Sequence, residues 1–520
     1  MTAHDRESEA EARGTRLKQL VRRGARIALA AQVASQLISL LVLATLYRRL
    51  SLEDYGLFGV VVPVLMLVRN LTTLGLGATA VQREEMSAET STSLFWWNVW
   101  IGAATMVLTA CAAPLVAWAY GDASAGWITF YLAGASFLAS LGTQHQALLE
   151  RAMNWKALAL VRLAAQAGAG FAAVQLALRG AGIWSLVAQQ YVEVGVTTAL
   201  CWWTAGWRPG TPRRHPDARQ LLGFGSHFAG AGLMFFLAGN VDKLLLGALL
   251  KADGRVAAGY YTQAFNFMMR PVYLLTAPLN SLMLPALARA RADAVAFREV
   301  YLGFQRLIST AMFPVAVGLC VTAPDVMLLL GGRNWHGAGE VLRALAPTIL
   351  VQGFINTTSS ALAAVGRADR LFAASVAFAT TMSLLSFAIL SWFRDDPDTV
   401  TILAGWYAAA SIGLFIPYQV WSLRTLNVPI QAWVSAILRP LLASLLMGVC
   451  VVAAHLGAYG WTWQTRQVAP LDTIFSLALQ IAIGVVCYVV LAWPDCCWLW
   501  TQLRRDVSLG GPPAVDSESR

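Results

Sequence analysis

The residues of this sequence best suited to chemistry inside a membrane are charged side chains within apolar runs. The stretch Gly239-Asn-Val-Asp-Lys-Leu-Leu-Leu-Gly247 places the acid Asp242 beside the base Lys243. Three more ionisable residues lie near the middle of long apolar runs: Arg69, Glu193 and Arg270. A lone ion near the bilayer centre costs roughly 2.5–3.5 kcal/mol on insertion scales. We therefore expect these side chains to face a wet cavity or a partner.

Asp242 and Lys243 are neighbours in sequence, so their side chains diverge by about 100° on a helix. We expect them not to face the same partner, and each to seek a group on another helix. One interpretation is structural, with Asp242 paired to Arg69 or Arg270. The other is functional: the three bases line a central cavity that accepts an anionic head group, and Asp242 holds one of them until substrate arrives. Arginine suits phosphate because its planar guanidinium binds two oxygens at once.

The elements that must position these side chains are membrane-spanning helices. Apolar residues make up 57% of the chain and charged residues 13%, with a mean hydropathy of +0.57. Soluble domains carry roughly one-quarter charged residues. A bilayer core about 30 Å thick takes about 20 apolar residues per helix. Fourteen such stretches leave no room for a soluble domain: 25–47, 55–80, 94–119, 127–149, 157–178, 183–206, 224–250, 256–284, 302–323, 340–364, 371–393, 399–423, 433–456 and 471–493.

The first stretch is expected to be a retained helix. It is longer than a signal-peptide core, and Tyr47-Arg48-Arg49 follows where cleavage requires small residues. With the N-terminus inside, most Lys and Arg fall in the tails and inner loops. The predicted outer loops hold only Arg48, Arg49, Arg179, Lys251, Arg255, Arg333, Arg394 and Arg466. The positive-inside bias therefore predicts two cytoplasmic termini. The net charge of +10 reflects this topology, and no nucleic-acid partner is expected.

Weak internal repeats predict a chain built from two related halves. Gly56-Leu-Phe58 resembles Gly259-Tyr-Tyr261, 203 residues on, and the segment 113–121 resembles 323–331, 210 residues on. Two six-helix bundles followed by two extra helices would give the layout of an alternating-access transporter. The predicted parts are a basic tail 1–24, an N-terminal lobe 25–206, a cytoplasmic linker 207–223, a C-terminal lobe 224–425, helices 13 and 14 in 426–500, and a disordered tail 501–520.

Signals for other chemistry are poor. The pair Asp396-Pro-Asp398 resembles a glycosyltransferase metal motif, but no catalytic domain surrounds it. No G-x-x-x-x-G-K-[ST] phosphate loop is present, so ATP is not the direct energy source. The seven cysteines lack the spacing of a zinc site or a disulfide framework. We expect no enzyme activity, no metal and no cofactor.

Several segments together resemble one transporter family. They are 50–59 (LSLEDYGLFG), 75–83 (GLGATAVQR), 240–247 (NVDKLLLG), 259–265 (GYYTQAF) and 278–287 (PLNSLMLPAL). This set is similar to the polysaccharide exporter and O-antigen (Wzx-type) flippase branch of the multidrug/oligosaccharidyl-lipid/polysaccharide (MOP) exporter superfamily. The similarity covers the first twelve predicted helices in order. Asp242 matches an acid often found in the seventh-helix pattern of that branch.

The resemblance implies an all-α membrane protein with two MATE-like six-helix lobes around a cavity, lined largely by helices 1, 2, 7 and 8. It implies transport of a lipid-linked oligosaccharide of the undecaprenyl pyrophosphate type across the bacterial inner membrane, with membrane lipid and polysaccharide polymerase or export proteins as partners. Glu193 and Asp242 would then be candidate proton or sodium sites. The alternatives are a MATE-like drug or cation antiporter, which would favour acids in its cavity, and a polysaccharide polymerase or ligase, which would need a large outer loop.

Overall fold

The computed structural model describes residues 31–73, 88–152, 154–211, 239–250, 254–459 and 470–498, together with Met234, Phe236, Leu237 and Thr501. The predicted tail 1–24, the linker beyond residue 211 and the tail 501–520 apart from Thr501 lie outside these residues. Within the described ranges the chain is helical and holds no strand, as the composition predicts. Ten of the described helical stretches are long and apolar enough to cross a membrane. The protein is a multi-pass membrane protein.

Each of the fourteen predicted stretches overlaps helical residues, which is consistent with fourteen spans. The first helix covers Ala31–Arg49. The helices that follow, with residues 239–250 helical between α7 and α9, are α2 (Leu52–Thr73), α4 (Ala88–Tyr120), α5 (Ala123–Arg151), α6 (Trp155–Leu178), α7 (Trp184–Ala205), α9 (Arg255–Ala290), α10 (Ala294–Gly331), η2 (Arg333–Trp335), α11 (His336–Leu345), η3 (Ala346–Thr348), α12 (Ile349–Ala364), α13 (Ala368–Trp392), α14 (Thr399–Thr425), α15 (Ile430–Tyr459) and α16 (Pro470–Leu491).

Short polar caps reverse the chain between several of these helices. Asp122 accepts a hydrogen bond from Ser124 N at 2.9 Å and begins α5, and Asp293 accepts from Val295 N at 2.8 Å and begins α10. A side-chain oxygen in this position satisfies backbone N–H groups that have no partner within the helix. Each cap starts a helix within a few residues of the end of the one before it, so sequential helices are antiparallel neighbours.

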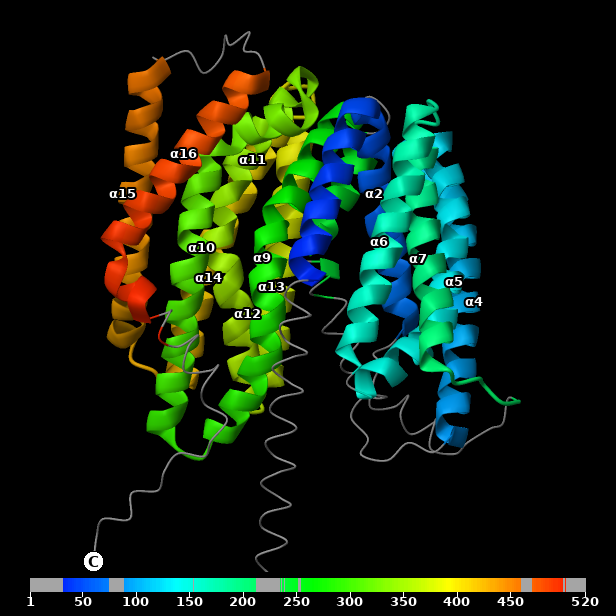
Figure 1. Cartoon of the computed structure of the whole chain (residues 1–520), viewed down its shortest axis with the longest axis horizontal. Coiled ribbons are helices and arrows are strands. Elements are labelled where there is room, and N and C mark those ends of the chain that lie inside the picture. Colours follow the sequence, from blue (N-terminus) through cyan, green and yellow to red (C-terminus); the bar gives the residue numbers. More distant parts are fainter. Residues whose placement is uncertain are drawn as a thin grey trace, which may run out of the picture.

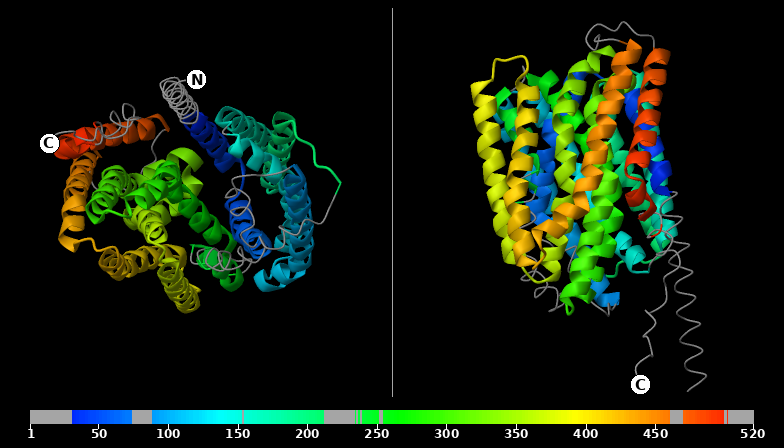
Figure 2. Two further views of the ribbon diagram at one scale, coloured as in Figure 1. Left: turned by 90° about the horizontal axis from the view of Figure 1, so that it is seen from below. Right: turned by 90° about the vertical axis from the view of Figure 1, so that its left-hand side faces the viewer.

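The helices gather in two groups (Figures 1 and 2). In one group α4 packs on α5, and α7 packs on both α5 and α6. In the other, α10 packs on α9, α11 and α12, α13 and α14 pack together, and α15 and α16 cover α10. Helices α2 and α9 lie between the groups and pack against each other (Figure 1). The arrangement agrees with two lobes and two extra helices, while the residue boundaries of the lobes remain a prediction.

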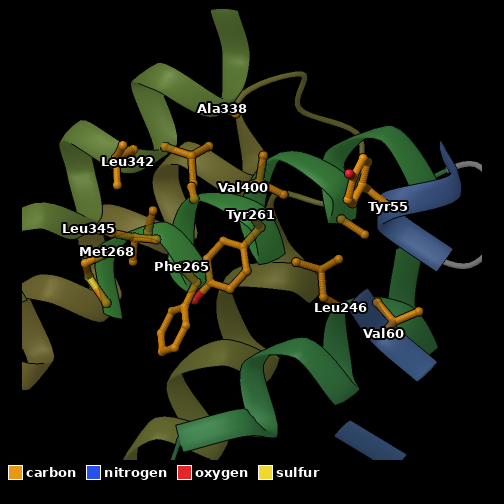
Figure 3. Close-up of a cluster of buried hydrophobic side chains, with 14 of the residues drawn as sticks. Tyr55, Val60, Leu246, Tyr261, Phe265, Met268, Ala338, Leu342, Leu345 and Val400 are labelled. Atoms are coloured by element: carbon orange, nitrogen blue, oxygen red, sulfur yellow. The ribbon is translucent and has the colours of Figure 1, made fainter. Parts of the chain in front are cut away.

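Two glycines allow α2 and α9 to cross in backbone contact. A Cβ at Gly56 would lie 1.8 Å from the carbonyl oxygen of Arg255, and one at Gly259 would lie 2.4 Å from the carbonyl oxygen of Leu52. The crossing involves the two segments that the internal repeat pairs. Around it the halves share one hydrophobic core, in which Tyr55 and Val60 of α2 lie near Leu246 and Tyr261 (Figure 3). We call this end of the molecule the closed end.

Candidate functional site

A cavity of about 670 Å³ lies between the two groups of helices. Most of its lining comes from the first helix, α2, α9 and the four residues Phe236, Gly239, Asn240 and Lys243, as the resemblance implies, and α6, α7, α12 and α14 supply the rest. Its charged lining residues are Lys243 and Arg270, and no carboxylate is among its described lining residues. Amides and a hydroxyl surround them: Ser39, Gln166, Gln189, Asn240, Gln263, Asn266 and Gln352. The lining therefore offers positive charge and many hydrogen-bonding groups.

Lys243 and Asp242 pair with each other, a contact that was not predicted from their positions in the sequence. Lys243 Nζ lies 3.3 Å from Asp242 Oδ1 and 3.4 Å from Oδ2, and it also donates to the carbonyl oxygen of Gly239 at 2.9 Å. The divergence of 100° describes where the two Cβ atoms point. A lysine stem has four flexible carbons, and here it bends back along its own helix.

Two aromatic residues of α9 complete this charged pair. Tyr261 donates a hydrogen bond from its hydroxyl to Asp242 Oδ2 at 2.6 Å, and Lys243 Nζ lies 3.4 Å from the centroid of the Phe265 ring. The rings of Tyr261 and Phe265 lie side by side one helical turn apart (Figure 3). Asp242 is fully buried behind the wall, while Lys243 reaches the cavity lining. A buried carboxylate is stabilised when it is both paired and hydrogen-bonded.

Arg270 supplies the second positive charge and comes from the same helix as Tyr261 and Phe265. Its side chain is half-buried in the cavity wall, and Nη1 donates to Ser39 Oγ of the first helix at 3.0 Å. This is its one hydrogen bond within the described part of the chain. A guanidinium has five N–H donors. Arg270 is therefore held in place by Ser39 and still has donors available to a ligand.

The other two predicted site residues lie elsewhere. Arg69 is exposed on α2 and is not among the residues that line the cavity. It follows Met66, a lining residue, by three positions, and so it continues the cavity-facing stripe of α2 beyond the cavity. Glu193 of α7 lines a separate pocket of about 350 Å³, with Glu150 and Arg162. The structure thus places Lys243 and Arg270 in the wall of one cavity, with Asp242 buried behind it, and places Glu193 outside it.

The closed end is held by contacts between the two halves. The rings of Tyr47 and Trp335 stack with centroids 3.9 Å apart, and Trp335 Nε1 donates to the carbonyl oxygen of Tyr47 at 2.9 Å. Asp122, at the start of α5, forms an ion pair with Arg255, the first residue of α9. These contacts surround the Gly56 crossing. The cavity is therefore blocked on this side and extends away from it, toward the far ends of α2 and α9.

Several lining residues were not predicted, although the sequence carries a signal for them. Gln263, Asn266 and Arg270 are spaced three and four apart, and such residues lie on one face of a helix. Asn240 and Lys243 repeat the spacing of three. A search for polar residues at helical spacing within apolar runs would have found both stripes. Tyr407 of α14 also lines the cavity.

Comparison with other proteins finds relatives that are named for polysaccharide biosynthesis or its transport steps. It is 22% identical over 423 residues to the teichuronic acid biosynthesis protein TuaB of Bacillus subtilis, covering 80% of this chain and 84% of that protein. It is 25% identical over 453 residues to the succinoglycan biosynthesis transport protein ExoT of Rhizobium meliloti, covering 86% and 87%. It is 24% identical over 341 residues to the lipopolysaccharide biosynthesis protein WzxC of Escherichia coli, covering 64% and 68%.

Solved structures give the same fold. The lipid II flippase MurJ in an inward closed conformation has a TM-score of 0.67 at 13% identity, over 92% of this chain and 99% of that chain. An inward-facing multidrug resistance MATE family transporter of the MOP superfamily has a TM-score of 0.61 at 12% identity, over 78% and 98%. Residues 42–340, more than half of the chain, match the family described as polysaccharide biosynthesis protein. With this match, the resemblance read from the sequence is confirmed, and the chain belongs to the polysaccharide biosynthesis protein family.

Proposed function

We propose that this protein is a flippase that moves a polyprenyl-pyrophosphate-linked oligosaccharide across the bacterial inner membrane by alternating access. The observation that carries the proposal is the cavity between the halves, whose charged lining consists of Lys243 and Arg270. A pyrophosphate is anionic, and cations in a partly dry cavity bind it strongly because little water screens them. The sugar units require hydrogen bonds, which the amides of the lining supply.

The Asp242–Lys243 pair stabilises the charge of Lys243 in the cavity wall. Lys243 Nζ is satisfied by Asp242, by Gly239 O and by the Phe265 ring, so this ammonium does not stand unpaired in the membrane. An arriving pyrophosphate competes for this ammonium. When Lys243 turns to the ligand, Asp242 keeps its hydrogen bond from Tyr261. The exchange requires a side-chain rotation, and the new contact between Lys243 and the pyrophosphate offsets the loss of the ion pair with Asp242.

The orientation follows from the positive-inside bias together with the closed end. With both termini in the cytoplasm, the contacts of Tyr47 and Trp335 lie on the periplasmic side, and the cavity extends toward the cytoplasm, where the lipid-linked sugar is made. Arg69, on the cavity-facing stripe of α2, then stands on the cytoplasmic side of the cavity and meets the pyrophosphate early. Glu193 and Asp242 remain candidate sites for a coupling proton or sodium ion, and a polysaccharide polymerase would receive the product.

The experiment that tests the proposal is export in a strain whose chromosomal copy has been deleted. Without the protein, undecaprenyl-linked repeat units should accumulate on the cytoplasmic face. The double variant Asp242→Asn/Lys243→Gln, which leaves no unpaired carboxylate, and Arg270→Gln should each restore export at least ten-fold less well than the wild type, at equal protein level. Arg298→Gln, which removes an exposed arginine near the start of α10, is the matched control and should restore export fully.

Two results would reject the proposal. Full export by both cavity variants would remove the cations from the mechanism. A deletion strain without lipid-linked intermediates, but with increased sensitivity to cationic drugs, would favour the second candidate, a MATE-like antiporter. The fold shared with multidrug transporters is the observation that favours this alternative, and the absence of a carboxylate from the described cavity lining opposes it.

A further inference from the structure

A second hollow, of about 470 Å³, lies inside the C-terminal group of helices between α12, α13 and α14. We call it the side pocket. Large apolar side chains form most of its wall: Ile355, Leu371, Phe378, Leu414, Phe415 and Trp421. α13 also contributes Ala373, Ala374 and Ala377, whose short side chains leave space in the pocket. The hydroxyls of Ser359 and Tyr418, also in the wall, lie 3.3 Å apart and satisfy each other. The side pocket therefore suits a hydrocarbon.

The side pocket adjoins the charged cavity. Gly239, Gln352 and Tyr407 line both spaces. At Gly239 the junction is open, because a Cβ placed there would meet no atom within 4 Å. Lys243 Nζ donates its hydrogen bond to the carbonyl oxygen of this same glycine at 2.9 Å. One of the two cations of the main cavity thus stands at the entrance to the side pocket.

Tyr407 adds an unused donor at the junction. Its side chain is only 2% exposed, and within the described residues its hydroxyl has no hydrogen-bond partner. A buried hydroxyl without a partner is costly, so a ligand that brings an acceptor to this point gains affinity. A phosphate oxygen held by Lys243 is such an acceptor. The junction then offers an ammonium and a hydroxyl on one side and a hydrocarbon pocket on the other.

The geometry points to the side pocket as the site that holds the first isoprenyl units of the substrate, those attached directly to the pyrophosphate. This inference rests on the proposed function. In a polyprenyl pyrophosphate the hydrocarbon begins at the charged group, which matches the order of cation, junction and apolar pocket. Pockets of about 300–1,000 Å³ enclose drug-sized ligands, so this one takes only a few units. Ala373 and Ala377 are exposed on α13, and the remaining chain leaves past them into the bilayer.

The test compares two probes on the purified full-length chain in nanodiscs, by titration calorimetry. The probes are inorganic pyrophosphate and farnesyl pyrophosphate, which differ by three isoprenyl units. Ala377→Trp fills the side pocket without reaching the main cavity. Ala388→Trp makes the same change at an exposed position of α13 outside the pocket and is the matched control. The wild type and the control should bind farnesyl pyrophosphate at least ten-fold more tightly than pyrophosphate. Ala377→Trp should lose that preference and keep its affinity for pyrophosphate.

The outcomes separate this inference from the proposed function. If Ala377→Trp keeps the ten-fold preference, the side pocket is not the isoprenyl site, although the head-group site stands. If the wild type binds neither probe, both ideas fail. A second measurement protects the test against a variant that does not fold. Farnesyl pyrophosphate with a benzophenone on its last unit should label wild-type residues 371–378 and 414–421, and labelling confined to other helices would overturn the inference.

Discussion

Gly259→Ala should weaken the closed end. In the present structure the added Cβ would lie 2.4 Å from the carbonyl oxygen of Leu52, and ordinary contact begins at 3.4 Å, so α2 and α9 must separate by about 1.0 Å. The obstructing atom belongs to the backbone and cannot rotate away. Overpacking of this kind costs about 1–3 kcal/mol. Alanine also favours the helix over glycine by about 1 kcal/mol, but this gain is equal in both conformations and cancels.

A bias of 1–3 kcal/mol changes the ratio of closed to open molecules by about 5- to 150-fold. Spin labels at Arg179 and Arg333 can measure it, because both residues are exposed, lie at the closed end and belong to opposite halves. Pulsed electron paramagnetic resonance on Gly259→Ala should show a larger long-distance population than the wild type. Gly405→Ala adds a methyl group on α14 where a Cβ meets nothing within 4 Å, and it should leave the distances unchanged.

Two results would refute this reasoning. If the distance distribution of Gly259→Ala matched that of the wild type, the glycine crossing would not set the conformational balance. If Gly405→Ala shifted the distances equally, the effect would come from alanine in a helix and not from the crossing. Reduced thermal stability without a change in distance would show that the clash destabilises the fold but does not shift the balance between closed and open molecules.

Two further predictions concern the charged pair. Tyr261→Phe removes one hydrogen bond from the buried Asp242, which should cost about 1–3 kcal/mol and lower the unfolding temperature in detergent. Tyr55→Phe is the control, because it removes a buried hydroxyl that has no partner within the described residues. It should leave the unfolding temperature unchanged. Lys243→Ala leaves a buried carboxylate without its cation, at a cost of about 3–5 kcal/mol, and should reduce the yield of folded protein. The double variant Asp242→Asn/Lys243→Gln should recover that yield, and a double variant as poor as Lys243→Ala would show that the pair is not the cause.

Much of the fold could be predicted from the sequence because a bilayer imposes one simple rule. Each spanning helix needs about 20 apolar residues, and stretches of that length stand out whatever their partners are. Packing between helices follows no such rule. The internal repeat pairs the Gly56 and Gly259 segments, but no pattern in the sequence indicates that they touch. Backbone contact between helices 203 residues apart depends on the whole arrangement of the bundle.

The site was predictable in its charges and less so in its geometry. Lys243 and Arg270 were expected in a central cavity and line one, because a cation in an apolar run needs water or a partner. Arg69 obeys the same reasoning but lies three residues past the last lining residue of its helix. Composition cannot predict whether Arg69 lines the cavity, since this depends on where α2 and α9 diverge. Tyr407 was missed because a lone tyrosine in an apolar run carries no signal of its own.

The pairing of Asp242 with Lys243 changes how the cavity must work. Had Asp242 paired with Arg270 on α9, releasing the cation would have required two helices to move apart. The observed pair lies within one helical segment, and Tyr261 holds the carboxylate whether or not Lys243 stays. Binding of an anion is therefore separable from the opening of the closed end. If so, a variant locked at the closed end by a cross-link between the halves should still bind pyrophosphate through Lys243 while failing to export.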